Sequence, residues 1–302
     1  MMRKNELVDE INKLKKMKSV SIISHFYQSE DIYSISDFIG DSLDMARKAQ
    51  ILDTKIVLVC GVEFMAETVK VLNPDSTVLL PNKKATCEMA DMIDVKSLSQ
   101  YRKNNPRMPT VAYINTSAAV KAMADICCTS KNATTIARSL GTDKVLLIPD
   151  ENIANYVRNS TGKEIRSFPG YCYVHKEMNI NVLLIKKQEH PNALTIAHPE
   201  CTSDILNQAD FVGSTGEMIA FIDTSSCQEF IVATEEGFVF ELRRRFRSKI
   251  FYSMNHVCRG MKSIELVDII RSIEREEYQI ELPKEIIEGA GKSLRRMLEI
   301  NA

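Results

Sequence analysis

Short apolar runs rich in β-branched residues alternate with amphipathic segments along most of the chain. A helix is predicted over residues 4–17, because its apolar side chains recur every three or four positions. Buried strands are predicted at 19–23, 56–59 and 77–80, and helical segments separate them. Strands joined through helices imply right-handed crossovers and parallel sheets, so the pattern indicates an α/β fold.

The same succession of elements occurs twice more, with a period of roughly 85 residues. Two positions of this repeat carry polar side chains in every copy: His25, Tyr113 and His198 at the first, and Ser42, Ser130 and Thr215 at the second. The repeat predicts three similar three-layer αβα domains with parallel sheets, arranged around a pseudo-threefold axis with a central active-site cavity. We expect these domains at 1–109, 110–193 and 194–302.

One more helical segment follows the last strand of each repeat, at about 92–103, 177–188 and 262–276. A final amphipathic helix is predicted between Pro283 and Ile300. We expect this last helix to pack against the N-terminal helix, and therefore to bring the end of the chain back to the first domain.

Polar side chains gather where the first strand of each repeat ends: His25 and Tyr27, Tyr113 and Asn115, and His198 and Glu200. Ligand sites of parallel sheets lie beyond the carboxyl ends of the strands, so these side chains are expected in one central cavity. The histidines and Tyr27 are candidate general acids or bases, and Glu200 is the best carboxylate candidate for moving a proton. Tyr113 and Asn115 would orient a substrate by hydrogen bonds.

Hydroxyl residues open the following helices, at Ser42, Ser130, Ser214 and Thr215. They are typical of helix N-caps, and a helix N-terminus with a free hydroxyl is also an anion site. Three such sites around one cavity would suit substrates with carboxylate and phosphate groups. The chain has neither the phosphate-binding loop nor the dinucleotide fingerprint, so no nucleotide is expected.

Three cysteines share a further repeat position, after the last strand of each copy: Cys87, Cys172 and Cys258. Three thiolates can hold three corners of a [4Fe–4S] cluster and leave one iron open as a Lewis acid. A zinc site on the same thiolates, completed by His175 or His256, is the first alternative. Three buried structural cysteines are the second.

Composition limits the remaining function classes. The chain of 302 residues is 44% hydrophobic and 26% charged, with a formal net charge of −1, so no nucleic-acid partner is expected. It contains no apolar run long enough for a membrane span and nothing that resembles a signal peptide, which favours a cytoplasmic location without disulfides. Four other cysteines are expected as small buried side chains: Cys60, Cys127, Cys201 and Cys227.

Several motifs spread over essentially the whole chain are specific in combination. They are His25-x-Tyr27-Gln28, Gly40-Asp41-Ser42, the cysteine at 87, Tyr113-x-Asn115-Thr116, Cys128-Thr129-Ser130, Gly170-x-Cys172-x-Val174-His175, His198-Pro199-Glu200-Cys201, Gly213-Ser214-Thr215-Gly216 and Cys258-x-x-Met261-Lys262. With these motifs the chain resembles the quinolinate synthase (quinolinate synthetase A) family, which acts in NAD biosynthesis.

The resemblance implies three α/β domains around one [4Fe–4S] cluster per chain, held by Cys87, Cys172 and Cys258. It implies the condensation of iminoaspartate with dihydroxyacetone phosphate to quinolinate, with loss of phosphate and water. L-Aspartate oxidase or aspartate dehydrogenase would be functional partners. By motif match the substrate is surrounded by His25, Tyr27, Ser42, Tyr113, Asn115, Ser130, His175, His198, Glu200, Ser214 and Thr215.

In the roles that follow from this match, Tyr27 and Glu200 move protons while His25 and His198 position oxygens. The stretch after Cys258 lacks the additional cysteines of some family members, so no disulfide switch is expected there. The alternative functions are a zinc-dependent enzyme using the same three cysteines, and a small-molecule binding protein on the same fold.

Overall fold

Three parallel four-stranded sheets with helices on their faces form the computed structural model, which describes residues 3–300. Residues 1, 2, 301 and 302, at the ends of the first and third predicted domains, lie outside the described residues. The elements of the first unit are α1 (Lys4–Lys18), β1 (Val20–His25), α2 (Glu30–Tyr33), β2 (Phe38–Gly40), α3 (Ser42–Ile51), β3 (Ile56–Cys60), α4 (Glu63–Leu72), β4 (Thr77–Leu79), α5 (Glu88–Asp91) and α6 (Val95–Lys103).

The second and third units repeat this order. The second comprises β5 (Thr110–Tyr113), α7 (Ala118–Ala122), β6 (Ile126–Cys128), α8 (Ala133–Ser139), β7 (Lys144–Ile148), α9 (Glu151–Thr161), β8 (Glu164–Ser167), α10 (Tyr173–Lys176) and α11 (Ile180–Glu189). The third comprises β9 (Leu194–Ala197), α12 (Ser203–Leu206), β10 (Phe211–Val212), α13 (Thr215–Thr224), β11 (Glu229–Ala233), α14 (Glu236–Arg245), β12 (Ile250–Ser253), α15 (Arg259–Lys262), α16 (Leu266–Arg275) and α17 (Lys284–Ile300).

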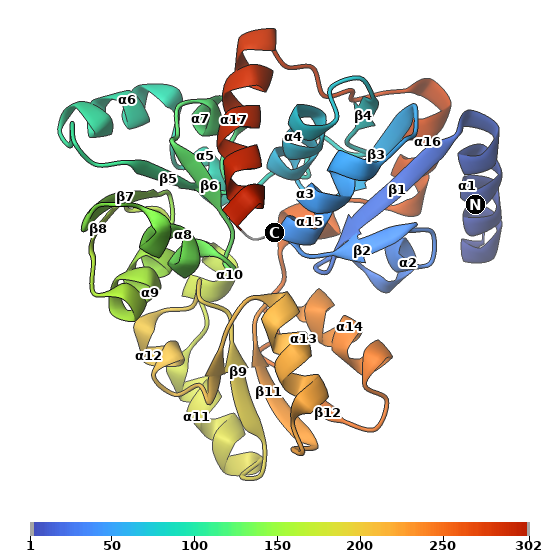
Figure 1. Ribbon diagram of the computed structural model, residues 1–302. Helices are drawn as coiled ribbons and strands as arrows, with labels where there is room; N and C mark the ends of the chain where they lie inside the picture. Colours follow the sequence, from blue (N-terminus) through green and yellow to red (C-terminus); the bar gives the residue numbers. More distant parts are fainter. Residues whose placement is uncertain (1–2, 301–302) are drawn as a thin grey trace.

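The three sheets have equivalent strand orders, β2-β1-β3-β4, β6-β5-β7-β8 and β10-β9-β11-β12. Figure 1 shows them around a common centre, which confirms the predicted fold class. The prediction of three strands per repeat was wrong, because each sheet has a fourth strand at one edge: β2, β6 or β10. These edge strands are only two or three residues long, so they carry no recognisable hydrophobic alternation.

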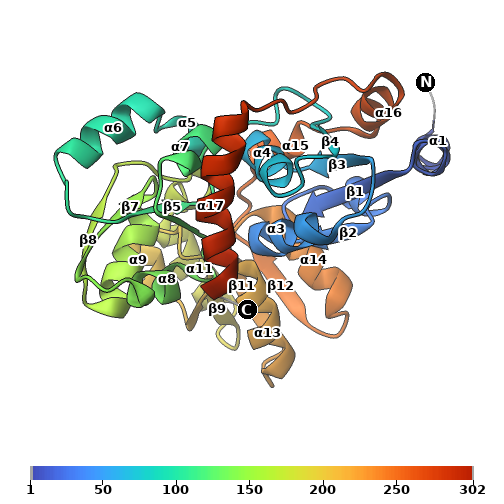
Figure 2. The ribbon, with the colours of Figure 1, turned by 45° about the horizontal axis from the view of Figure 1, so that its top comes forward.

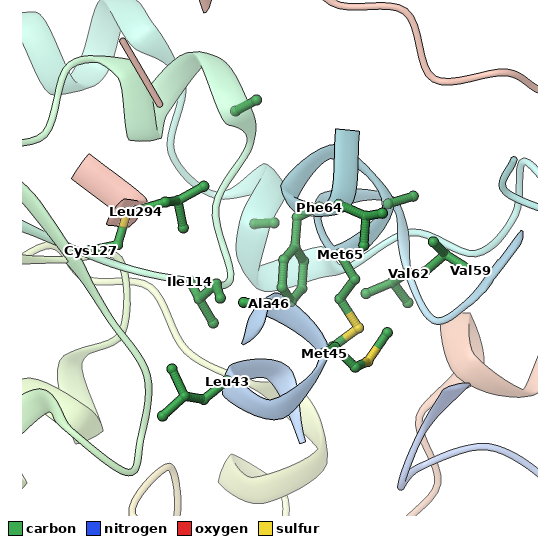
Figure 3. Packing of buried hydrophobic residues seen from close by; sticks show 14 of the residues in the cluster. Leu43, Met45, Ala46, Val59, Val62, Phe64, Met65, Ile114, Cys127 and Leu294 are labelled. Carbon is green, nitrogen blue, oxygen red and sulfur yellow. The ribbon is translucent and has the colours of Figure 1, made fainter. Parts of the chain in front are cut away.

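The central strands are buried on both faces, as their uninterrupted apolar runs predict; every residue of β3 is buried. A large cluster of buried side chains extends through the first and second units. Figure 3 shows part of it, with Leu43, Phe64, Met65 and Ile114 gathered between α3, α4 and the segment after β5. This packing joins the first two units into one core, so the separation of the three predicted domains stays a prediction.

The longer helix that comes after the one-turn helix at each cysteine packs on the next unit; these longer helices are α6, α11 and α16. The hydroxyl of Tyr101 in α6 donates to the Ser167 carbonyl of the second unit at 2.6 Å. Leu183 of α11 belongs to the buried cluster of the third unit. Helix α16 lies against α1 of the first unit, and Lys18 Nζ donates to the Glu274 carbonyl at 2.9 Å. The units are therefore interlocked in cyclic order.

The expected pairing of the last helix with the N-terminal helix was wrong. Helix α17 packs against α7, β6 and α4, between the first and second units, as Figures 1 and 2 both show. The Ser293 hydroxyl donates to the Lys121 carbonyl at 2.8 Å on the second unit. Helix α16 lies beside α1 instead, so its apolar side covers the surface of α1 that the final helix was expected to cover.

Within residues 3–300, no helix is long and apolar enough to cross a membrane.

Candidate active site

A cavity lies where the carboxyl ends of the three sheets meet. Its walls include twelve of the predicted site residues: His25, Tyr27, Ser42, Cys87, Tyr113, Asn115, Ser130, Cys172, His198, Glu200, Thr215 and Cys258. Apolar side chains from α3, α4 and the segment after β5 form one side of it, and Figure 3 shows Leu43, Phe64, Met65 and Ile114 there. The cavity is thus lined by polar side chains at the strand ends and, on one side, by apolar side chains.

Two predicted site residues, His175 and Ser214, do not line this cavity. Ser214 caps α13: its hydroxyl lies 2.8 Å from Glu217 Oε2 in a reciprocal capping box, so the N-cap interpretation is confirmed. The predicted helix opening at Ser130 was wrong, because α8 begins at Ala133 with Asn132 as its N-cap. Ser130 instead lies in the loop after β6, and this loop places it on the cavity wall.

Buried hydrogen bonds connect side chains of all three units at one end of the cavity. The Tyr27 hydroxyl lies 2.8 Å from Thr234 Oγ1, and His175 Nε2 lies 2.9 Å from the same oxygen. On the other side of the ring, His175 Nδ1 lies 2.8 Å from Glu200 Oε2. Tyr113 donates its hydroxyl to the second carboxylate oxygen, Glu200 Oε1, at 2.6 Å. These contacts connect Tyr27 with Glu200 through Thr234 and His175.

Burial sets the charge states along this path. Burial alone would raise the pKa of Glu200, but His175, His198 and the Tyr113 hydroxyl more than offset it and lower that pKa below its usual range. Burial, and then the charge of Glu200, raise the pKa of both Tyr27 and Tyr113 well above the ordinary value. At neutral pH the site therefore holds an ionised Glu200 between protonated phenols.

The two histidines at equivalent repeat positions adopt the same local turn. His25 Nδ1 accepts the Tyr27 N–H at 3.1 Å, and His198 Nδ1 accepts the Glu200 N–H at 3.4 Å. Burial lowers the pKa of each imidazole to about 3, so both are neutral near pH 7. Because Nδ1 accepts a hydrogen bond, the proton resides on Nε2, which leaves each ring a neutral donor.

Cys87, Cys172 and Cys258 line the same cavity, each as the N-cap residue of a one-turn helix: α5, α10 or α15. All three are free thiols. Burial, with smaller contributions from the charges of Cys258 and Glu200, raises the pKa of Cys87 to about 12. Burial, and then the charges of Glu200, Cys87 and Cys258, raise the pKa of Cys172 well above its ordinary value. Each thiol therefore rests protonated unless a positive charge compensates it.

This donor set fits an iron–sulfur cluster. Three half-buried thiolates at the wall of one cavity need compensating positive charge, and soft sulfur donors select iron–sulfur clusters or zinc. A zinc site completed by His175 is disfavoured because both nitrogens of that ring already contact Thr234 and Glu200. The ligand atoms of Cys172, His175 and Glu200 do lie within 4.8 Å of one another. His256 does not line the cavity, and its Nδ1 lies 2.8 Å from the Met254 carbonyl.

Burial was predicted for four other cysteines, and the structure confirms it for three of them. Cys60, Cys127 and Cys201 are buried, whereas Cys227 is half-buried and contacts the Asn192 carbonyl at 3.4 Å. The prediction of burial was therefore wrong for Cys227, because it lies in the loop before β11 rather than in a strand.

Sequence reasoning missed Thr234, which joins Tyr27 to His175. A signal was present, because Thr234 directly follows β11, whose neighbour β9 ends beside His198. Polar residues that directly follow β3, β7 or β11 are therefore candidates for the same site, since all parallel strands of a sheet end at the same edge.

The fold and the site define a class of protein: a three-unit α/β protein with a buried network of titratable side chains and three cysteines in one cavity. A family model described as quinolinate synthetase A protein matches residues 9–299. The chain belongs to this family and is therefore an enzyme, associated with NAD biosynthesis.

Relatives named quinolinate synthase cover nearly the entire chain. The chain is similar to that of Pyrococcus furiosus, with 43% identity over 98% of each chain. It is also similar to that of Alkaliphilus metalliredigens, with 42% identity over 99% of this chain and 100% of the relative. The family resemblance predicted from the motifs is confirmed.

Proposed function

We propose that the chain is a quinolinate synthase, which condenses iminoaspartate with dihydroxyacetone phosphate and closes the pyridine ring of quinolinate, with loss of phosphate and water. The names of its relatives support the product. The observation that carries the mechanism is the series of close polar contacts from Tyr27 through Thr234 and His175 to Glu200, in the cavity that the three cysteines line.

In this proposal Cys87, Cys172 and Cys258 hold one [4Fe–4S] cluster per chain. With three protein ligands, such a cluster keeps one iron open and supplies a Lewis acid toward a carboxylate or hydroxyl. The shared position of the three thiols on the wall of one cavity supports this assignment.

Tyr27 is the group that exchanges protons with the substrate carbon or oxygen. Its phenol passes a proton to Thr234 Oγ1 while the Thr234 hydroxyl passes its own to His175 Nε2. The imidazolium that forms is stabilised by the Glu200 carboxylate 2.8 Å from Nδ1. The raised pKa keeps the Tyr27 phenol protonated near pH 7, so its oxygen gives a proton to the relay as it takes one up from the substrate.

The other wall residues bind and orient the substrates. The neutral His25 and His198 rings donate from Nε2 to substrate oxygens, and Tyr113 holds Glu200 in place. Asn115 and the hydroxyls of Ser42, Ser130 and Thr215, which line the same cavity, bind carboxylate and phosphate groups. The assignment of Ser214 to substrate binding stays a prediction, because its hydroxyl is engaged by Glu217.

Iminoaspartate is an α-imino acid that hydrolyses in water, so its supplier has to be an enzyme that oxidises aspartate. We assign this role to an aspartate oxidase or aspartate dehydrogenase. The eight free cysteines agree with a reducing compartment, which supports the cytoplasm as the location.

The experiment that tests the proposal is metal analysis of anaerobically purified protein, followed by a turnover assay with iminoaspartate and dihydroxyacetone phosphate. About four irons and four labile sulfides per chain, together with quinolinate formation, are the expected result. Zinc without sulfide would contradict the cluster, and a full cluster without quinolinate would contradict the reaction.

A further inference from the structure

The residue that follows each of the three cysteines takes part in a single contact network outside the cavity. These residues are Glu88, Tyr173 and Arg259, the first residues of α5, α10 and α15. Each comes from a different unit of the fold. The three units therefore contact one another at these equivalent positions as well, each one residue after a cysteine.

Arg259 joins the other two residues. Its Nη2 donates to Glu88 Oε1 at 2.8 Å, and its guanidinium carbon lies 4.4 Å from the centre of the Tyr173 ring. An ion pair and a cation–π contact thus connect the third unit to the first and second units.

The Tyr173 hydroxyl also holds the backbone on both sides of Cys258. It accepts the Arg259 N–H at 2.6 Å and donates to the Val257 carbonyl at 3.4 Å. A side chain of the second unit therefore fixes the peptide segment that presents a cysteine of the third.

The segments around two of the cysteines are also in direct van der Waals contact. Gly260 lies so close to the Thr86 carbonyl that a Cβ at this position would collide with it. Because Thr86 precedes Cys87 and Gly260 follows Cys258 by two residues, this contact places the two cysteine segments side by side.

The network lies on the outer side of the thiols. A hollow separate from the central cavity is lined by all three cysteines together with Glu88, Tyr173 and Arg259. The thiols therefore separate the cavity from this hollow, and the Arg259 side chain, which is 71% exposed, spans its outer side from Tyr173 to Glu88.

We propose that Glu88, Tyr173 and Arg259 form a clasp that positions the three cysteines relative to one another and limits access to them from outside. The inference concerns the same three-cysteine site as the proposed function. It extends that function by naming residues that pre-organise the site from three separate units, which lowers the cost of bringing the thiols together.

The test uses the full-length protein without metal, under anaerobic conditions, so that it does not depend on a cluster. Iodoacetamide labelling of Cys87, Cys172 and Cys258 is followed by peptide mass spectrometry. The half-buried Cys227 lies outside the cavity and the hollow, and its labelling rate serves as an internal reference.

Arg259→Met keeps the aliphatic stem and removes both contacts of the guanidinium. We expect labelling of all three cysteines to accelerate about tenfold, which corresponds to about 1.4 kcal/mol, with Cys227 unchanged. Glu88→Gln should produce a smaller acceleration, greatest at Cys87. Tyr173→Phe removes only the hydroxyl and should act mainly on Cys258, whose flanking peptides it holds.

The matched control is Lys176→Met. Lys176 makes the same kinds of contact, an ion pair with Glu151 at 2.9 Å and a cation–π contact with Tyr171 at 3.7 Å, but all three residues belong to the second unit. This variant should label like the wild type.

Wild-type labelling rates in Arg259→Met would overturn the clasp, as would acceleration at Cys258 alone or an equal acceleration in Lys176→Met. A protein that shows the expected labelling but binds no iron would retain the clasp and lose the proposed cluster. The two failures are therefore distinguishable.

Discussion

At the scale of single residues, the chemistry depends on groups whose protonation burial has altered. Tyr27 is a buried phenol whose hydroxyl contacts Thr234, and Glu200 is a buried carboxylate kept ionised by its neighbours. In the proposed mechanism, the contacts through Thr234 and His175 let the phenol lose its proton near pH 7. Two predictions belong to this scale.

Tyr27→Phe should retain the metal centre and lose most of the turnover, by a factor of about 10²–10⁴, because the proton-transferring oxygen is gone. The iron-dependent absorbance and the rate of quinolinate formation would be measured on the same sample. Tyr33→Phe is the control, because Tyr33 is also a buried phenol but donates to the Phe26 carbonyl at 2.7 Å, outside the cavity. A Tyr27→Phe rate close to wild type would remove this residue from the mechanism.

His25→Asn should make the free energy of unfolding less sensitive to acid. The pKa of His25 is lowered from 6.5 to about 3 by burial, so between these values the unfolded chain binds a proton that the folded chain does not. This contribution to stability is complete above about pH 6.5 and is lost as the pH falls toward 3.

Urea unfolding of the metal-free proteins at pH 7 and pH 5 measures the effect. The wild type should lose about 2 kcal/mol more than His25→Asn between these two pH values. Equal losses would mean that the imidazole of His25 is protonated equally in the folded and unfolded chains.

At the scale of elements, helices α14 and α15 hold the first unit against the third. Lys262 of α15 donates to the Tyr27 carbonyl and lies 3.1 Å from Glu235 Oε1. The buried Glu235 carboxylate also accepts the N–H groups of Cys258 at 3.0 Å and Gly237 at 2.6 Å. One ion pair therefore fixes the backbone of both Tyr27 and a cysteine of the three-cysteine site.

The position of Gly237 explains how closely these elements approach. A Cβ at this residue would lie 2.7 Å from Lys262 Nζ and 2.8 Å from the Gln28 carbonyl. A side chain at position 237 would therefore push Lys262 away from its partners. Glycine is required here for close approach rather than for backbone conformation.

Lys262→Met should lower the free energy of unfolding by about 2 kcal/mol, because it leaves the buried Glu235 carboxylate without its cation. Turnover should fall as well, since the Tyr27 backbone loses its donor. The double variant Lys262→Met/Glu235→Gln removes the unpaired charge and should recover part of the stability. Denaturant unfolding of the three proteins checks this, and a double variant less stable than Lys262→Met would contradict the argument.

At the scale of the whole molecule, the site exists only because three units converge. Each unit supplies one cysteine, and the proposed proton path takes Tyr27 from the first, His175 from the second and Glu200 from the third. Helices α6, α11 and α16 each pack on the next unit, and α17 joins the first two units. Relative placement of the units is therefore as important as any single side chain.

Cys172→Ser should lose the metal centre, because two thiolates and a hydroxyl no longer provide three soft ligands. Iron and labile sulfide would be determined after anaerobic reconstitution. Cys227→Ser, which changes a half-buried cysteine outside the cavity, should keep the full iron content. Full iron content in Cys172→Ser would refute the ligand assignment.

The sequence by itself determined the repeated α/β architecture and most of the cavity wall. Hydrophobic runs and polar strand ends are local signals, and three copies in one register made them reliable, so His25, Tyr113 and His198 could be assigned to one cavity. Parallel sheets then placed these residues at the same edge for a purely geometric reason.

Only the tertiary structure decided the contacts between units. The role of Thr234, the partner of α17 and the meeting of Glu88, Tyr173 and Arg259 depend on how the units are oriented relative to one another. Local periodicity carries no information about that orientation, because many arrangements bury the same apolar faces. It is fixed by side-chain packing across the units, which appears only once the whole chain has folded.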